Sequence, residues 1–185
     1  MIARAEKAVE FIFNNLCDSE ERLLRRYREG EARYYGYLFD YTAMVNACLD
    51  LYETTYNPDY IGLARKLLKV VSEKFSAPNG AYYETSSDAE DLIVRQLTSY
   101  DGVEPSGNSG AAMAFLRLGA YEVDPQLIER ARDIMLVFLD DIMEYGLNAP
   151  YMMQASHLYL GGLKEVAVVG RCGEASTEEM LNFLL

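Results

Sequence analysis

The sequence predicts a mainly α-helical protein built from antiparallel helical hairpins that pack side by side. Apolar residues recur at helical spacing in several long segments. A proline stands in the expected first turn of three of these segments, at Pro58, Pro125 and Pro150. Short turns separate successive helices, which is the usual connection between antiparallel neighbours.

The first helix follows from five apolar residues near the amino terminus, at positions 2, 5, 9, 12 and 16. Residues 23–40, LLRRYREGEARYYGYLFD, interrupt that period with charged and aromatic side chains and two glycines. We expect an extended hairpin or an ordered loop there. The helical pattern returns at Leu38 and continues to Tyr52.

The later helices begin at prolines or after a loop. The helix that starts at Asn57-Pro58 keeps its apolar side as far as Phe75. A helix is expected over about 110–121, and further helices start at Pro125 and Pro150.

The carboxyl-terminal part differs in kind from the rest. Residues 165–170, EVAVVG, form a continuous β-branched run, which is typical of a buried strand. A single strand needs a neighbour from this chain or from another one. We therefore expect two units, a helical unit over 1–163 and a strand with a helix packed on it over 164–185.

The charge balance excludes some partners. Acidic residues outnumber basic ones by 29 to 17, so the formal net charge of the 185 residues is −12. No basic stripe offsets it, so nucleic acid and anionic membrane surfaces are not expected partners.

The cysteines and the amino terminus indicate a soluble cytoplasmic protein. The three cysteines lie far apart and form no CxxC pair, which argues against a disulfide framework and a zinc site. The amino terminus is charged and amphipathic, unlike a signal peptide, and no apolar run approaches the length of a membrane span. We expect no metal and no cofactor.

The densest polar stretch is the loop at residues 100–110, YDGVEPSGNSG. Its glycines and proline make a loop, and Ser106, Asn108 and Ser109 all suit a helix N-cap. The helix that follows opens with alanines, so it can lie close to another backbone. Such a loop is either a structural joint or the floor of a site.

Several segments in the same order resemble the spermatogenesis-associated protein 20 family. They are LLRRYREGEARYYGYLFDYTAMVNACLDLYETT, GAYYETSSDAEDLIVRQ, the signature DGVEPSGNSG and the final KEVAVVG. That family joins a thioredoxin-like domain to a six-hairpin α/α toroid similar to N-acylglucosamine 2-epimerases and six-hairpin glycosidases. The resemblance implies that this chain is a partial α/α toroid, without the thioredoxin-like domain and the early hairpins.

The resemblance also implies a cavity at the loop end of the helices. Asp101 and Asp40 are the expected catalytic residues, with Arg95 as the partner of Asp101. Glu84 and Asp91 are weaker additions. The expected ligand-binding residues are Tyr41, Arg95, Ser106, Asn108 and Ser109.

Each candidate has a structural alternative. Asp101 can fix the turn while Ser106 or Asn108 caps the helix, and Asp40 can be an N-cap. Arg95 can form a salt bridge with Asp91 or Asp101. Tyr41 can belong to the core. The single histidine, His157, cannot supply the histidine pair on which the similar epimerases rely.

Two classes of function remain. A half toroid leaves two apolar edges open, so we expect a ligand-binding or interaction module. Its pocket would be completed by self-association, or by a protein that carries the missing half and the thioredoxin-like domain. The alternative is a sugar epimerase, isomerase or glycosidase-like enzyme with acid–base residues around DGVEPSGNSG. In both cases the expected ligand is a carbohydrate.

Overall fold

The computed structural model describes residues 1–89, 93–171 and 173–184. Within these ranges the chain is mainly helical, as predicted, and its one sheet is a two-stranded hairpin. The elements are α1 (Ile2–Asn15), β1 (Leu24–Arg28), β2 (Glu31–Tyr35), α2 (Leu38–Thr55), α3 (Asp59–Lys74), α4 (Gly107–Glu122), α5 (Pro125–Val137), α6 (Leu139–Tyr145), a 3-10 helix η1 (Gly146–Asn148), α7 (Pro150–Gly161) and α8 (Ala175–Leu184).

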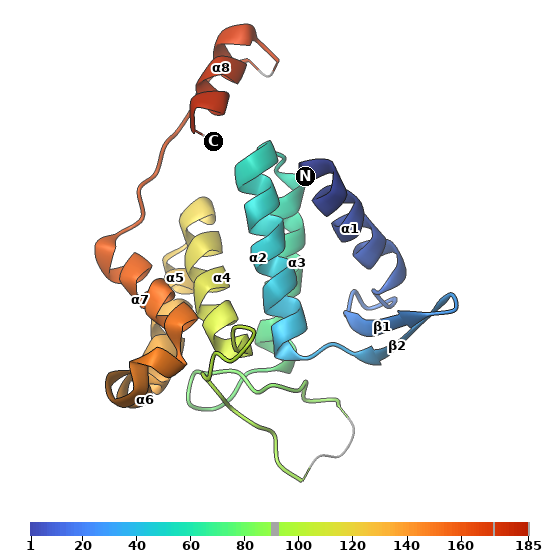
Figure 1. The fold of residues 1–185 in the computed structure, drawn as a ribbon, viewed down its shortest axis with the longest axis vertical. Coiled ribbons are helices and arrows are strands. Elements are labelled where there is room, and N and C mark those ends of the chain that lie inside the picture. Colours follow the sequence, from blue (N-terminus) through green and yellow to red (C-terminus); the bar gives the residue numbers. More distant parts are fainter. Residues whose placement is uncertain (90–92, 172, 185) are drawn as a thin grey trace.

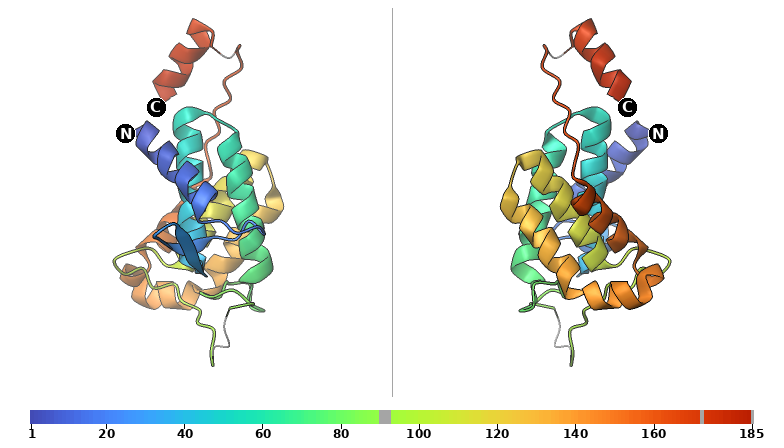
Figure 2. Two further views of the ribbon diagram at one scale, coloured as in Figure 1. Left: turned by 90° about the vertical axis from the view of Figure 1, so that its right-hand side faces the viewer. Right: turned by 90° about the vertical axis from the view of Figure 1, so that its left-hand side faces the viewer.

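Three helices, α2, α4 and α7, stand side by side as an arc (Figure 1). Helix α3 packs antiparallel on α2, and α5 packs antiparallel on α4, so that α3 and α5 form a second row behind the first (Figure 2). The helices α2, α4 and α7 all begin at the same end of the molecule. The β-hairpin, the long connection between α3 and α4 and the helix η1 gather at that end, which we call the loop end.

Helix α4 is the centre of the core because small residues let α2 approach it closely. A Cβ atom added to Gly107 would lie 2.6 Å from Leu38, and one added to Gly110 would lie 2.5 Å from the Oγ1 of Thr42. Asn46 of α2 donates a 3.1 Å hydrogen bond to the carbonyl oxygen of Gly110. The helix lies close to α2 at Gly107 and Gly110, whereas the sequence predicted a close approach at the alanines that follow.

An ion-pair network joins α2 and α4 further along. Arg117 of α4 lies 2.7 Å from Asp50 and 2.8 Å from Glu53, both on α2. The Arg117 side chain is largely buried, so these two carboxylates hold a charge that water reaches poorly. Tyr121 also donates to Glu53.

The segment of residues 23–40 contains the predicted hairpin. Strands β1 and β2 pair antiparallel around a turn at Glu29 and Gly30, which both have positive φ angles. The hairpin projects from the side of the arc next to α1 (Figure 1). Its register places Arg26 directly opposite Arg33.

The strand predicted over Glu165–Gly170 was wrong. Residues 162–169 have no regular secondary structure, and most of them are exposed. A β-branched run becomes a strand only beside another strand, and the one described sheet lies across the arc from it. Helix α8 follows, and the carbonyl oxygen of Leu181 accepts a hydrogen bond from the Tyr56 hydroxyl. The division of the chain at 163/164 stays a prediction.

Among the described residues, none of the helices combines the length and apolar character that crossing a bilayer requires.

Candidate functional site

The central loop joins the amino-terminal ends of α4 and α7, and Asp101 is its hub. One carboxylate oxygen of Asp101 accepts a 2.7 Å hydrogen bond from the backbone N–H of Ser106. The other oxygen accepts from the N–H groups of Tyr151 and Met152 in the first turn of α7, at 2.7 and 3.4 Å. The side chain is buried. A carboxylate at this place accepts hydrogen bonds from backbone N–H groups that have no partner inside the helix. Its negative charge also interacts favourably with the positive end of the helix dipole.

Ser106 caps helix α4, and Ser109 lies in the first turn of that helix. The Ser106 hydroxyl accepts from the N–H of Ser109 at 3.1 Å and donates to the Ser109 hydroxyl at 2.9 Å. Both side chains are buried. Their hydroxyl groups therefore already have partners inside the protein.

Asn108 clamps two extended segments to the start of α4. Its side-chain oxygen accepts from the Tyr82 N–H, and its amide group donates to the carbonyl oxygens of Tyr82 and Thr98, each bond 2.9 Å long. The side chain is fully buried. One amide side chain therefore fixes both parts of the connection between α3 and α4.

Arg95 is bound to carbonyl oxygens and not to Asp101. It donates to the carbonyl oxygens of Thr85 and Lys74, the latter at 3.2 Å, and its guanidinium lies 4.1 Å from the centre of the Tyr83 ring. The expected pairing of Arg95 with Asp101 is not formed. Asp91 lies outside the described residues.

Asp40 and Tyr41 serve the start of α2. Asp40 accepts a 2.7 Å hydrogen bond from the N–H of Tyr37 and lies 3.7 Å from Arg25. The Tyr41 hydroxyl accepts from the N–H of Leu23 at 2.9 Å, and its ring packs edge-on against a core phenylalanine. Burial raises the pKa of the Tyr41 hydroxyl to about 12.

Glu84 is the carboxylate whose chemistry stands out. Its Oε1 atom is buried and has no hydrogen-bond partner among the described residues. Burial raises the pKa of its carboxyl to about 7. The backbone of Glu84 is held at the loop end by hydrogen bonds with Leu38 and Gln96, both 2.9 Å long. Sequence reasoning ranked Glu84 low because nothing in the run AYYET shows that one oxygen of this carboxylate is buried.

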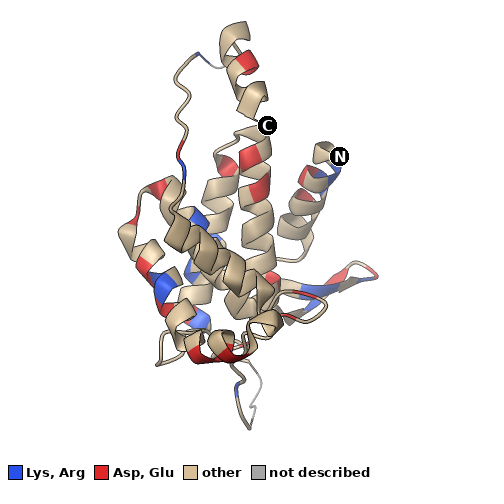
Figure 3. Cartoon of the chain, turned by 60° about the vertical axis from the view of Figure 1, so that its left-hand side comes forward, with Lys and Arg blue, Asp and Glu red and all other residues tan. Residues whose placement is uncertain are grey.

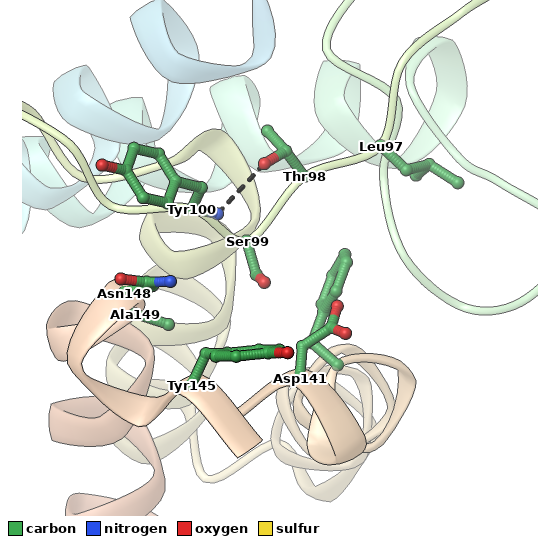
Figure 4. Close-up of a pocket in the computed structure, with 9 residues that line it drawn as sticks. Leu97, Thr98, Ser99, Tyr100, Asp141, Tyr145, Asn148 and Ala149 are labelled. Atoms are coloured by element: carbon green, nitrogen blue, oxygen red, sulfur yellow. Dashed lines mark hydrogen bonds between the residues drawn. The ribbon is translucent and has the colours of Figure 1, made fainter. Parts of the chain in front are cut away.

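A small pocket of about 210 Å³ lies beside the Asp101 joint (Figure 4). Asp141 and Tyr145 of α6 face the extended segment of residues 97–100, which contributes the buried Ser99. Sequence reasoning missed all of these residues because α6 lies far from the segment along the chain. Within the described ranges no cluster of acidic, histidine and cysteine side chains could hold a metal ion. His157 is exposed on α7.

No protein-family model matches the chain. Curated relatives do match nearly all of it. An uncharacterized protein of Caenorhabditis elegans is 30% identical over 90% of the chain, and spermatogenesis-associated protein 20 of Mus musculus is 24% identical over 98%. The chain covers 24% of the length of each. The human spermatogenesis-associated protein 20 is 27% identical over 74% of the chain.

Two solved structures with a similar fold are cellobiose 2-epimerases. The enzyme from Bacillus thermoamylovorans matches 99% of this chain with 53% of its own, at a TM-score of 0.67 and 15% identity. The enzyme from Spirochaeta thermophila matches 74% of this chain with 36% of its own, at a TM-score of 0.59 and 16% identity. The resemblance to the spermatogenesis-associated protein 20 family and the partial α/α toroid are thus confirmed.

Proposed function

We propose that the chain is an interaction and ligand-binding module, half of an α/α toroid whose pocket is completed by helical hairpins from a second copy or another chain. The observation that carries this proposal is the exposed apolar surface at one edge of the arc. Met143, Leu147 and Leu160 are 79%, 95% and 81% exposed on α6, η1 and α7. Large apolar side chains exposed on three successive elements are candidates for an interface, because monomers rarely expose apolar surface without a function.

The pocket geometry supports the same proposal. Sites for small molecules usually enclose about 300–1,000 Å³, and the pocket beside Asp101 is smaller, about 210 Å³. The acidic composition and the dispersed cysteines fit a cytoplasmic module. The ligand class follows from the epimerase-like fold alone, so a carbohydrate ligand is part of the proposal.

Light scattering on the purified chain tests the association. We expect a mass of at least twice 20.9 kDa at micromolar concentration. If the chain is a monomer there, a lysate protein that carries the missing hairpins should raise the mass and protect the apolar edge from dye binding. A chain that stays monomeric with its edge unprotected contradicts the proposal.

Glu84 favours a second candidate, an acid–base enzyme acting on sugars. A carboxyl group with a pKa of about 7 at the loop end is suited to give and take a proton near neutral pH. A thermal-shift and activity screen against mono- and disaccharides tests this with wild type, Glu84→Gln and Asp101→Ala. Turnover that Glu84→Gln abolishes while ligand stabilisation persists supports the enzyme. No response to any sugar argues against it.

A further inference from the structure

The two ends of the arc carry opposite charge at the loop end, where two copies of the chain would meet. The β-hairpin projects from one side of the arc, and α6 lies at the other side (Figure 1). Figure 3 shows basic residues along the hairpin with acidic residues near its turn, and acidic residues on α6.

On the hairpin, three arginines share one face. Arg26, Arg28 and Arg33 lie at alternate positions of the two paired strands, together with a single carboxylate, Glu31. Arg33 pairs with Glu31, and Arg28 pairs with Glu29. Arg26 stands directly opposite Arg33 and has no carboxylate partner in the described part of the chain. Like charges directly opposite one another destabilise a hairpin unless an anion lies nearby.

On α6, one exposed face has the complementary character. Asp140, Met143 and Glu144 lie one helical turn apart, and Leu147 of η1 continues the same face. All four are exposed, and neither carboxylate pairs with a cation in the ranges that the structure describes. Two carboxylates four residues apart repel each other on an isolated helix. This face therefore presents unpaired negative charge beside exposed apolar side chains.

We infer that a second copy of this chain closes the ring head to tail, with the arginine face of each hairpin docked on the Asp140–Leu147 face of its partner. The inference rests on the proposed function and specifies its partner. Two observations support a second copy. The chain supplies both complementary faces itself, and it matches 53% of a toroidal epimerase, so two copies provide about one such toroid.

The symmetry follows from the position of the two faces. A twofold axis parallel to α2, α4 and α7 leaves every residue at its height along the helices. Because the hairpin and α6 both lie toward the loop end, this axis brings the hairpin of one copy to α6 of the other, twice per dimer. Arg26 and Arg33 then meet Asp140 and Glu144. Arginine is a common anchor of such interfaces.

Charge reversal tests the arrangement. The double variants R26E/R33E and D140R/E144R should each raise the dissociation constant of the dimer about tenfold or more, because each puts like charges across both contacts. An equimolar mixture of the two should recover the wild-type mass, since every contact in the mixed dimer pairs opposite charges. Sedimentation velocity measures the masses, and circular dichroism checks the fold.

The single variant R26E distinguishes weaker association from loss of the fold. R26E places a glutamate opposite Arg33, so the hairpin gains a cross-strand ion pair while the docking face loses positive charge. We expect weaker dimers, and an unchanged or higher melting temperature at concentrations where both proteins are monomeric. If none of the charge reversals changes the dissociation constant of the dimer, this arrangement of the two faces is wrong. The same holds if the mixture of the two double variants stays monomeric. In either case the wild-type chain still self-associates, so the proposed function stands. A wild-type monomer contradicts the self-association, and open polymers overturn the closed ring.

Discussion

At the scale of single residues, the central loop is a joint. Asp101, Ser106 and Asn108 each satisfy backbone or hydroxyl groups of neighbouring elements, and all three are buried. Such networks are stabilising only when every member is paired. Glu84 differs, because one of its oxygens is buried without a partner among the described residues. We therefore make separate predictions for Asp101, which has hydrogen-bond partners on both oxygens, and for Glu84.

Replacing Asp101 by asparagine should destabilise the protein by roughly 2–4 kcal/mol, because an amide places N–H groups where the carboxylate accepts three backbone N–H groups. Chemical denaturation measures the change. Asp124→Asn is the matched control, since Asp124 caps α5 at a partly exposed position and asparagine caps equally well. If Asp101→Asn and Asp124→Asn destabilised the protein equally, Asp101 would not have the structural role that its hydrogen bonds indicate.

The pKa of Glu84 predicts a pH dependence of stability. Its folded pKa of about 7 lies above the ordinary value of 4.5, so the folded state binds more protons between these values. The contribution of Glu84 to stability is therefore greatest below about pH 4.5 and is lost as the pH rises through 7, by on the order of 2–3 kcal/mol.

Denaturation curves from pH 5 to 8 should show this decline in wild type and not in Glu84→Gln. The exposed Glu104→Gln should behave like wild type. A decline that persists unchanged in Glu84→Gln would show that another group titrates.

At the scale of elements, the contact between α2 and α4 depends on glycine. Gly110 faces Thr42 so closely that a Cβ atom would overlap it, whereas Gly62 of α3 faces open space. Both glycines lie inside helices, where alanine is intrinsically more favourable. Comparing an alanine substitution at each position therefore distinguishes the effect of helix propensity from the effect of close packing.

Gly110→Ala should destabilise the protein by about 1–3 kcal/mol, since α2 and α4 must move apart. Gly62→Ala should be neutral or stabilise it by up to about 1 kcal/mol. Thermal unfolding of the two variants beside wild type measures both effects. A neutral Gly110→Ala would mean that the helices are not closely packed there.

The sequence predicts the elements that depend on local patterns and not those that depend on distant partners. Helices follow from local apolar spacing and from proline starts, so most of them were predicted. The strand over Glu165–Gly170 was wrong because a strand depends on a partner that local sequence does not specify. The loop at Asp101 was located, but its contacts with Tyr151 and Tyr82 are distant in sequence and could not be foreseen. The burial of the Glu84 Oε1 atom also depends on residues that are distant in sequence, so it could not be predicted either.

At the scale of the whole molecule, the arc of α2, α4 and α7 is part of an α/α toroid, and the chain matches 53% of one cellobiose 2-epimerase. Its open edge exposes Met143 and Leu147, and its two ends differ in charge. These features favour closure by further hairpins, and the arginine and carboxylate faces favour a second copy as their source. The cavity would then be lined from both copies, so ligand affinity should depend on protein concentration.

Small-angle X-ray scattering over a series of concentrations tests this account most directly, because it measures mass and shape together. We predict a particle of twice 20.9 kDa whose scattering fits a closed ring of two arcs. A mass of 20.9 kDa at every concentration, or a dimer whose arcs extend end to end, would contradict it.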